Sequence, residues 1–129
     1  MQEIPHEGAL TDLLWSDPDP ERPGFNPSQR GAGYLFGAAV VKKFLQQNGF
    51  AHVTRAHQLC MDGYQCLFDD QLSTVWSAPN YCYRCGNIAA VMEVSDRLDR
   101  NFNTYDASPD NDKSKPDAEE AKDVPDYFV

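Results

Sequence analysis

One short loop, residues 79–86 of a 129-residue sequence, contains four side chains that could do chemistry: Tyr81, Cys82, Arg84 and Cys85. A guanidinium binds phosphate or carboxylate, and thiols act as metal ligands or nucleophiles. Apolar segments at 74–77 and 88–94 flank this loop, as expected for two strands that present it. Proline and then Asn80 end the first segment. From the residues alone, a ligand-binding loop and a long hairpin loop with two core tyrosines are both open.

The four cysteines allow a zinc hypothesis. Cys82 and Cys85 have the spacing of zinc ligands, whereas Cys60 and Cys66 are separated by five residues in a segment that predicts a strand. A zinc ribbon has two tight pairs, each beside a glycine. We therefore predict reduced, partly buried thiols, with a small zinc module as the alternative.

Four further residues could take part in catalysis. Arg30 lies in the glycine-containing segment 28–33, and a guanidinium on such a loop suits bidentate phosphate binding. His57 follows an expected strand, where it is either a hydrogen-bonded structural residue or a metal ligand. Asp17 and Asp19 each precede a proline, which favours turn formation over a direct catalytic role.

These residues need elements to position them, and the hydrophobic pattern predicts an α+β fold. Apolar residues at four-residue steps predict one helix over residues 34–48, ended by Gly49. The expected strands are 8–15, 50–54, 61–68, 72–77, 88–94 and 101–106, of which 61–68 and 72–77 form a hairpin across residues 69–71.

Composition limits the possible functions. A hydrophobic content of 41% indicates a globular chain. The net charge of −9 argues against nucleic-acid or anionic-membrane binding. No apolar run is long enough to span a membrane, and the first residues lack a secretory signal. We therefore expect a cytoplasmic or nuclear protein.

The composition changes at residue 107. Residues 107–129 contain three prolines and seven acidic residues against three lysines. Such a segment has little to bury, so we predict a globular part over 1–106 and a disordered acidic tail over 107–129.

Four sequence motifs carry a resemblance: SAPNYCYRCGN in the central loop, with LLWSDPD, RGAGYLFG and RAHQL upstream. They closely resemble the carboxy-terminal portion of the PPP-family serine/threonine protein phosphatases. CYRCGN and the final DYFV are similar to the type 2A branch, which includes the type 4 and type 6 (Sit4-like) enzymes. The resemblance implies part of a four-layer α/β/β/α metallophosphoesterase (calcineurin-like) sandwich, mainly one sheet with one covering helix.

The resemblance also implies site residues. Arg30 and Tyr81 would serve catalysis by binding the substrate phosphate, and His57 would bind one of two divalent metal ions of the manganese, iron or zinc type. Asn80, Cys82, Arg84 and Cys85 would complete the active-site loop. Tyr127 and Val129 would belong to a regulatory tail, although the family ends in leucine. The family usually has proline where this chain has Gln29.

The implied reaction is two-metal hydrolysis of phosphoserine and phosphothreonine in phosphoproteins, with scaffold and regulatory subunits as partners. The family's GDxHG, GDxVDRG and GNHE motifs, which carry most metal ligands, do not occur here. We therefore expect a truncated form that is inactive alone. The alternative is a non-catalytic fragment that binds phosphatase scaffold and regulatory subunits.

Overall fold

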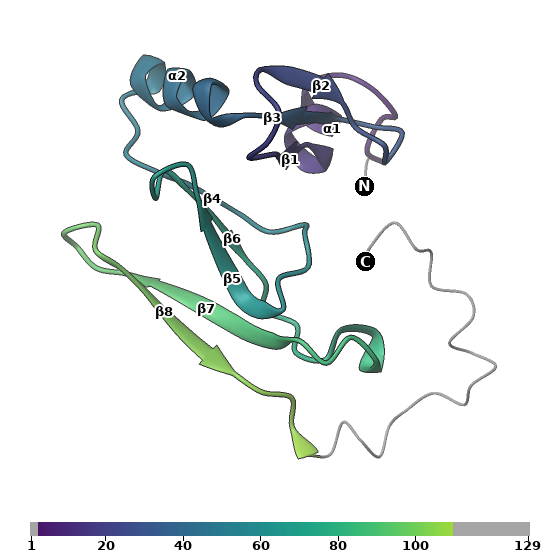
Figure 1. Ribbon diagram of the computed structural model, residues 1–129, viewed down its shortest axis with the longest axis vertical. Coiled ribbons are helices and arrows are strands. Elements are labelled where there is room, and N and C mark those ends of the chain that lie inside the picture. Colours follow the sequence, from purple (N-terminus) through teal and green to yellow (C-terminus); the bar gives the residue numbers. More distant parts are fainter. Residues whose placement is uncertain (1–2, 110–129) are drawn as a thin grey trace. The chain divides into compact units, whose positions relative to one another are not determined.

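A computed structural model describes residues 3–109 (Figure 1). The fold is α+β, with two helices, one short 3₁₀ helix and two mixed sheets among these residues. The described elements divide into two compact units: residues 3–57 with 66–73, and residues 58–65 with 74–109. No helix among residues 3–109 has the length and apolar character to cross a membrane.

The first unit opens with helix α1 (Ala9–Trp15), where we had predicted a strand. Leu10, Leu13 and Leu14 have helical i, i+3, i+4 spacing, which the short apolar run had masked. The prediction of a single helix was therefore wrong as well. The hydroxyl of Thr11, which is buried, donates to the carbonyl of Pro5 and anchors this helix.

A three-stranded sheet follows, in the order β1-β3-β2. Its strands are β1 (Asp17–Pro18), β2 (Phe25–Pro27) and β3 (Tyr34–Phe36), with β1 parallel and β2 antiparallel to β3. The predicted helix over 34–48 is thus a strand followed by a helix. Gly37 separates them: a Cβ there would lie 2.3 Å from the carbonyl oxygen of Arg22.

Helix α2 (Ala38–Asn48) ends at Gly49 in the left-handed conformation, as predicted. Val41 and Leu45 of this helix are buried against Leu72 and form the core of the first unit. Phe36, Val53, Leu67 and Phe68 pack around this core. The periodic apolar stripe therefore serves packing.

The second sheet has the strand order β4-β6-β5-β7-β8. Its strands are β4 (Val53–Arg55), β5 (Asp62–Leu67), β6 (Leu72–Val75), β7 (Ile88–Val94) and β8 (Arg100–Tyr105). The predicted hairpin and the last two strands are confirmed; the strand predicted at 50–54 begins later, at residue 53.

In the second unit, β7 runs parallel to the start of β5 and antiparallel to β8. Ala89 and Ala90 are fully buried, and the rings of Tyr64 and Phe102 stack with centroids 4.1 Å apart. Gly63 has φ +80°, and a Cβ there would lie 2.6 Å from the carbonyl carbon of Ala89. The close approach of β5 to β7 therefore requires glycine at this position.

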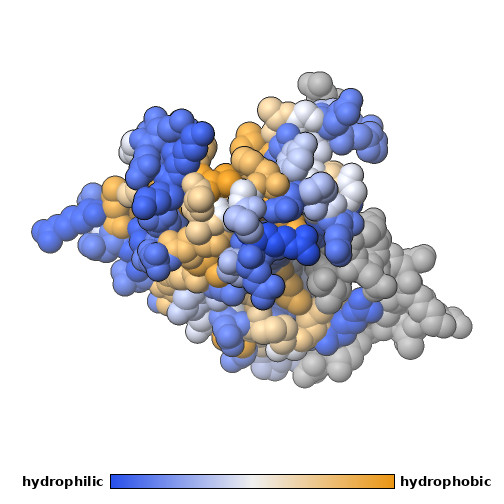
Figure 2. Space-filling model, turned by 45° about the horizontal axis from the view of Figure 1, so that its top comes forward, coloured by the Kyte–Doolittle hydropathy of each residue, from blue (hydrophilic) through white to orange (hydrophobic). Residues whose placement is uncertain are grey.

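Hydrophobic side chains also reach the surface, as orange patches on the face shown in Figure 2. In the first unit they line a groove of about 540 Å³. Leu13, which lines this groove, is 80% exposed. The groove is lined largely by apolar residues: Leu13, Phe25, Phe36, Val40 and Phe44.

Candidate functional site

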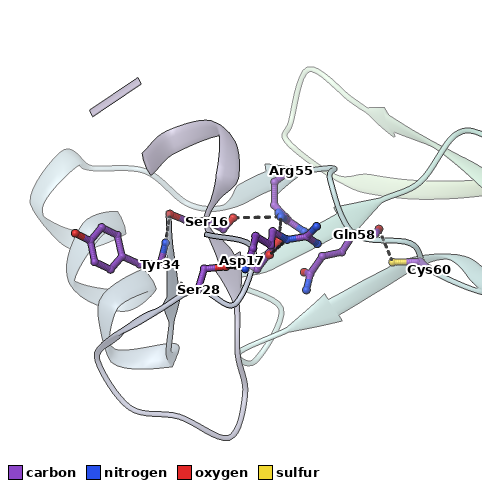
Figure 3. Close-up of polar contacts among 8 residues, drawn as sticks. Ser16, Asp17, Ser28, Tyr34, Arg55, Gln58 and Cys60 are labelled. Atoms are coloured by element: carbon purple, nitrogen blue, oxygen red, sulfur yellow. Dashed lines mark hydrogen bonds and ion pairs between the residues drawn. The ribbon is translucent and has the colours of Figure 1, made fainter. Parts of the chain in front are cut away.

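The candidate site residues of the first unit meet at Asp17. Its carboxylate is 3% exposed and accepts from Arg30 Nε at 2.6 Å. It also accepts from Arg55 Nη2 at 2.6 Å (Figure 3). Arg55 Nη2 also donates to the Ser16 carbonyl at 3.3 Å. One buried carboxylate therefore orients two guanidinium groups and leaves the trio with one net positive charge.

The sequence explains how these three side chains meet. Asp17 opens β1, Arg55 ends β4, and Arg30 lies in the loop before β3. Gly33 has φ +68°, and a Cβ there would lie 2.8 Å from Ser16 N, so only glycine lets this loop lie against the start of β1. The Ser28 hydroxyl accepts from the backbone N–H of Arg30 at 3.2 Å.

The prediction that both aspartates shape turns was right for Asp19 and wrong for Asp17. Asp19 Oδ1 accepts from the backbone N–H groups of Glu21 and Arg22, as a turn residue does. Asp17 forms the buried ion pairs instead. Its location between proline-rich turns concealed this role, because Arg30 and Arg55 lie 13 and 38 residues away in the sequence.

His57 follows β4 in a left-handed backbone conformation, with φ 78°. Such strain in a non-glycine residue costs about 1–3 kcal/mol and is concentrated at functional sites. Burial lowers the pKa of His57, Arg30 and Arg55 lower it further, and Asp17 acts in the opposite direction. The imidazole is thus held neutral, and its edge-on contact with Trp15 has a centroid separation of 5.5 Å.

The Nε2 atom of His57 is buried and has no hydrogen-bond partner among residues 3–109. A buried polar atom without a partner is costly, and a neutral imidazole nitrogen is the commonest protein ligand for metals. His57 therefore fits one coordination position. Within the described residues, no group of three or more histidine, cysteine or acidic side chains could hold a metal ion.

The second unit carries the loop with Tyr81. The 3₁₀ helix η1 (Tyr81–Tyr83) lies within it, and Asn80, Cys82 and Tyr83 all have positive φ. The Tyr81 ring contacts Trp76 edge-on, with centroids 4.7 Å apart. This loop lies in a different unit from Arg30 and His57.

The other predicted loop residues differ in their surroundings. Asn80 accepts from the N–H of Gly86 through its side chain, at 3.0 Å. Arg84 is exposed and, with Asn80, lines a polar hollow that also includes Asp106. Cys82 and Cys85 are free, partly exposed thiols, as predicted. The predicted tail residues Tyr127 and Val129 lie outside the described residues.

Comparison with known proteins now identifies the family. Residues 1–61 match the calcineurin-like phosphoesterase family. A protein phosphatase 2A catalytic subunit of Dictyostelium discoideum is 62% identical over 129 residues, which are 100% of this chain and 41% of that protein. The serine/threonine-protein phosphatase 4 catalytic subunit of Eremothecium gossypii is 57% identical over 111 residues, 86% of this chain and 36% of that protein.

A solved serine/threonine phosphatase of Saccharomyces cerevisiae, similar to human phosphatase PP5, superposes with a TM-score of 0.72 at 36% identity. It covers 81% of this chain, which spans 36% of that structure. The fold is thus that of the calcineurin-like metallophosphoesterases, a family that implies divalent metal ions. The chain spans about two fifths of the length of the relatives it matches. On these similarities, the chain belongs to the type 2A-like branch of the PPP-family serine/threonine protein phosphatases.

Proposed function

We propose that this chain is part of the catalytic domain of a metal-dependent phosphatase that hydrolyses phosphoserine and phosphothreonine in proteins. The observation that carries the proposal is the cluster of Asp17, Arg30 and Arg55 beside a neutral His57. Two oriented guanidinium groups can donate charged hydrogen bonds to a phosphoryl dianion and offset part of its charge, and the buried carboxylate keeps them in place before the substrate arrives. Arg30 would bind the phosphoryl group.

The same proposal gives His57 the role of ligand to one of two divalent ions of the manganese, iron or zinc type. Its unpartnered Nε2 supports this role. When bound, a metal pair supplies a deprotonated water and charge neutralisation at the phosphoryl oxygens. Tyr81 would contact the substrate, with Asn80, Cys82, Arg84 and Cys85 shaping the loop around it.

We further propose that the isolated chain does not turn over phosphoprotein. One imidazole holds such ions weakly, because tight binding needs several ligands in fixed geometry. The residues that would complete the site correspond to the GDxHG, GDxVDRG and GNHE motifs. The proposed active form therefore contains the rest of the domain, with residues 1–106 as its carboxy-terminal part and 107–129 as a tail.

A second candidate function is a non-catalytic one, favoured by the short span relative to the relatives and by the acidic segment 107–129. In this case the chain binds phosphatase scaffold and regulatory subunits in the cytoplasm or nucleus, with Tyr127 and Val129 in the contact. Co-precipitation of these subunits with the chain, lost on removing residues 107–129 and independent of Arg30, would support it over the catalytic function.

A chimera tests the catalytic proposal. This chain replaces the matching part of the Dictyostelium phosphatase, with which it aligns over 129 residues. We expect manganese-dependent phosphate release from a phosphothreonine peptide. Arg30→Ala should lower kcat/KM by about 10²–10³-fold, because it removes a preorganised cation at the developing charge. Arg97→Ala, at an exposed turn, is the matched control and should change kcat/KM little.

Two results would contradict the proposals. If Arg30→Ala and Arg97→Ala changed the kcat/KM of the chimera equally, Arg30 would not be a phosphate-binding residue. For the isolated chain, manganese-dependent hydrolysis that is abolished by Arg30→Ala would disprove its inactivity.

A further inference from the structure

The loop that carries Tyr81 is strained. Asn80, Cys82 and Tyr83 have φ of 44°, 54° and 57°, in the left-handed region that non-glycine residues rarely adopt. Each such residue costs on the order of 1–3 kcal/mol, and it persists only where the surroundings impose it. Some fixed group must therefore hold this loop closed.

Asn87, the residue immediately before β7, is that group. Its side chain is buried, with the residue 3% exposed. Oδ1 accepts from the backbone N–H of Tyr81 at 2.8 Å, and Nδ2 donates to the carbonyls of Ala78 and Ile88 at 2.9 and 3.0 Å. Its own carbonyl accepts from the N–H of Asn80 at 2.8 Å. One residue thus connects both ends of the loop to Tyr81 within it.

The chemistry of the carboxamide matters here. Asn87 uses an acceptor and two donors in one plane, a set that only asparagine and glutamine offer. Aspartate keeps the acceptor but would place a carboxylate against two carbonyl oxygens. A buried network of this kind is stable only when every member has its partner.

The bond to Tyr81 fixes the backbone while Trp76 fixes the ring, at a centroid distance of 4.7 Å. We propose that Asn87 is the positioning residue for Tyr81: it aims this side chain without contacting the substrate. The proposal deepens the proposed phosphatase function, on which it rests for the meaning of Tyr81. The geometry that it claims can be tested without turnover.

The test measures amide hydrogen exchange by NMR in the full chain carrying Asn87→Ala. We expect the Tyr81 amide to exchange about tenfold faster or more, since it loses a buried acceptor. The amide of Ala90, which donates to the Trp76 carbonyl within the same unit, should keep its protection. Asn103→Ala, at an exposed site on β8, is the matched control and should change neither amide.

Asn87→Asp is the second variant, with the emission of Trp76 as the signal in a Trp15→Phe background. At neutral pH the carboxylate should loosen the loop and shift the emission away from that of the Asn87 parent. Acidification to about pH 5 should partly restore it, because the neighbouring carbonyls raise the pKa of the new carboxyl and the protonated acid regains one donor.

The outcomes separate the possibilities. Faster exchange at Tyr81 with Ala90 unchanged, and an emission recovered by acid only in Asn87→Asp, would support the positioning role. An unchanged Tyr81 amide in Asn87→Ala would overturn it, as would equal loss of protection at Tyr81 and Ala90 in that variant or an Asn87→Asp emission that acid does not restore. Neither measurement uses hydrolysis, so failure of the phosphatase proposal would show only in the chimera assay.

Discussion

Two regions carry the residues proposed for catalysis, and they are held in different ways. In the first unit an ionised carboxylate, Asp17, orients Arg30 and Arg55 through charged hydrogen bonds. In the second, a neutral carboxamide, Asn87, orients Tyr81 through its backbone. The first arrangement holds two guanidinium groups where a phosphoryl dianion would bind. The second holds the backbone of Tyr81, and so sets the direction of an uncharged side chain. A charged group therefore positions charged side chains, and a neutral group positions a neutral one.

The largest expected effect comes from neutralising the carboxylate. Asp17→Asn removes the negative charge that two guanidinium groups, 18% and 13% exposed, contact at 2.6 Å, and should lower the free energy of unfolding by about 3–5 kcal/mol. Urea unfolding measures this loss. Asp19→Asn is the matched control: its amide oxygen can still accept from the same turn N–H groups, so the change should be within about 0.5 kcal/mol. Equal losses in the two variants would mean that Asp17 is also only a turn residue.

A smaller effect should follow when the charge stays and the shape of its donor changes. Arg55→Lys keeps a cation but loses the planar fork, of which one nitrogen contacts Asp17 and the Ser16 carbonyl. We expect a loss of about 1–2 kcal/mol, since one hydrogen bond to a charged group is removed while the ion pair persists. Urea unfolding of Arg55→Lys and Asp17→Asn under the same conditions shows which variant loses more free energy of unfolding. A lysine variant as damaging as Asp17→Asn would show that geometry, rather than charge, holds the cluster.

In the loop, the ring of Tyr81 should matter more for stability than its hydroxyl. Tyr81→Ala removes the edge-on contact with Trp76, which is worth about 0.5–1.5 kcal/mol beyond the buried area. Tyr81→Phe keeps the contact and should melt like the unsubstituted chain. Thermal unfolding monitored by near-ultraviolet circular dichroism distinguishes them. A destabilised phenylalanine variant would show that the hydroxyl contributes to the fold.

The smallest effect is expected at the thiols. Cys82 and Cys85 are free and partly exposed, so replacing both with serine should change the free energy of unfolding by less than about 0.5 kcal/mol. Metal analysis of the purified chain should find no stoichiometric zinc. Zinc bound one to one and lost in the double variant would restore the zinc-module hypothesis.

How much of this could be read from the sequence depended on how local each feature is. Periodicity and turn residues predict the local features: the end of helix α2 at Gly49, the hairpin across residues 69–71 and the strand at 88–94. Helix α1 was missed because its apolar run is too short to separate helix from strand. Asp17 was missed for a different reason: its partners lie 13 and 38 residues away, so sequence spacing carries no sign of them. Asn87 was missed although its partners are near in the sequence, because their hydrogen bonds depend on the backbone conformation of the loop. The unpartnered nitrogen of His57 likewise required coordinates.

Gly63 has a consequence for interpreting natural variation. Every single-nucleotide missense change in a glycine codon introduces a side-chain carbon, and here that carbon would overlap the main chain of Ala89. The same glycine accepts from the N–H of Trp76. A missense allele at codon 63 should therefore lower the amount of folded protein in the cell, whatever the chemistry of the new residue and wherever the catalytic groups lie.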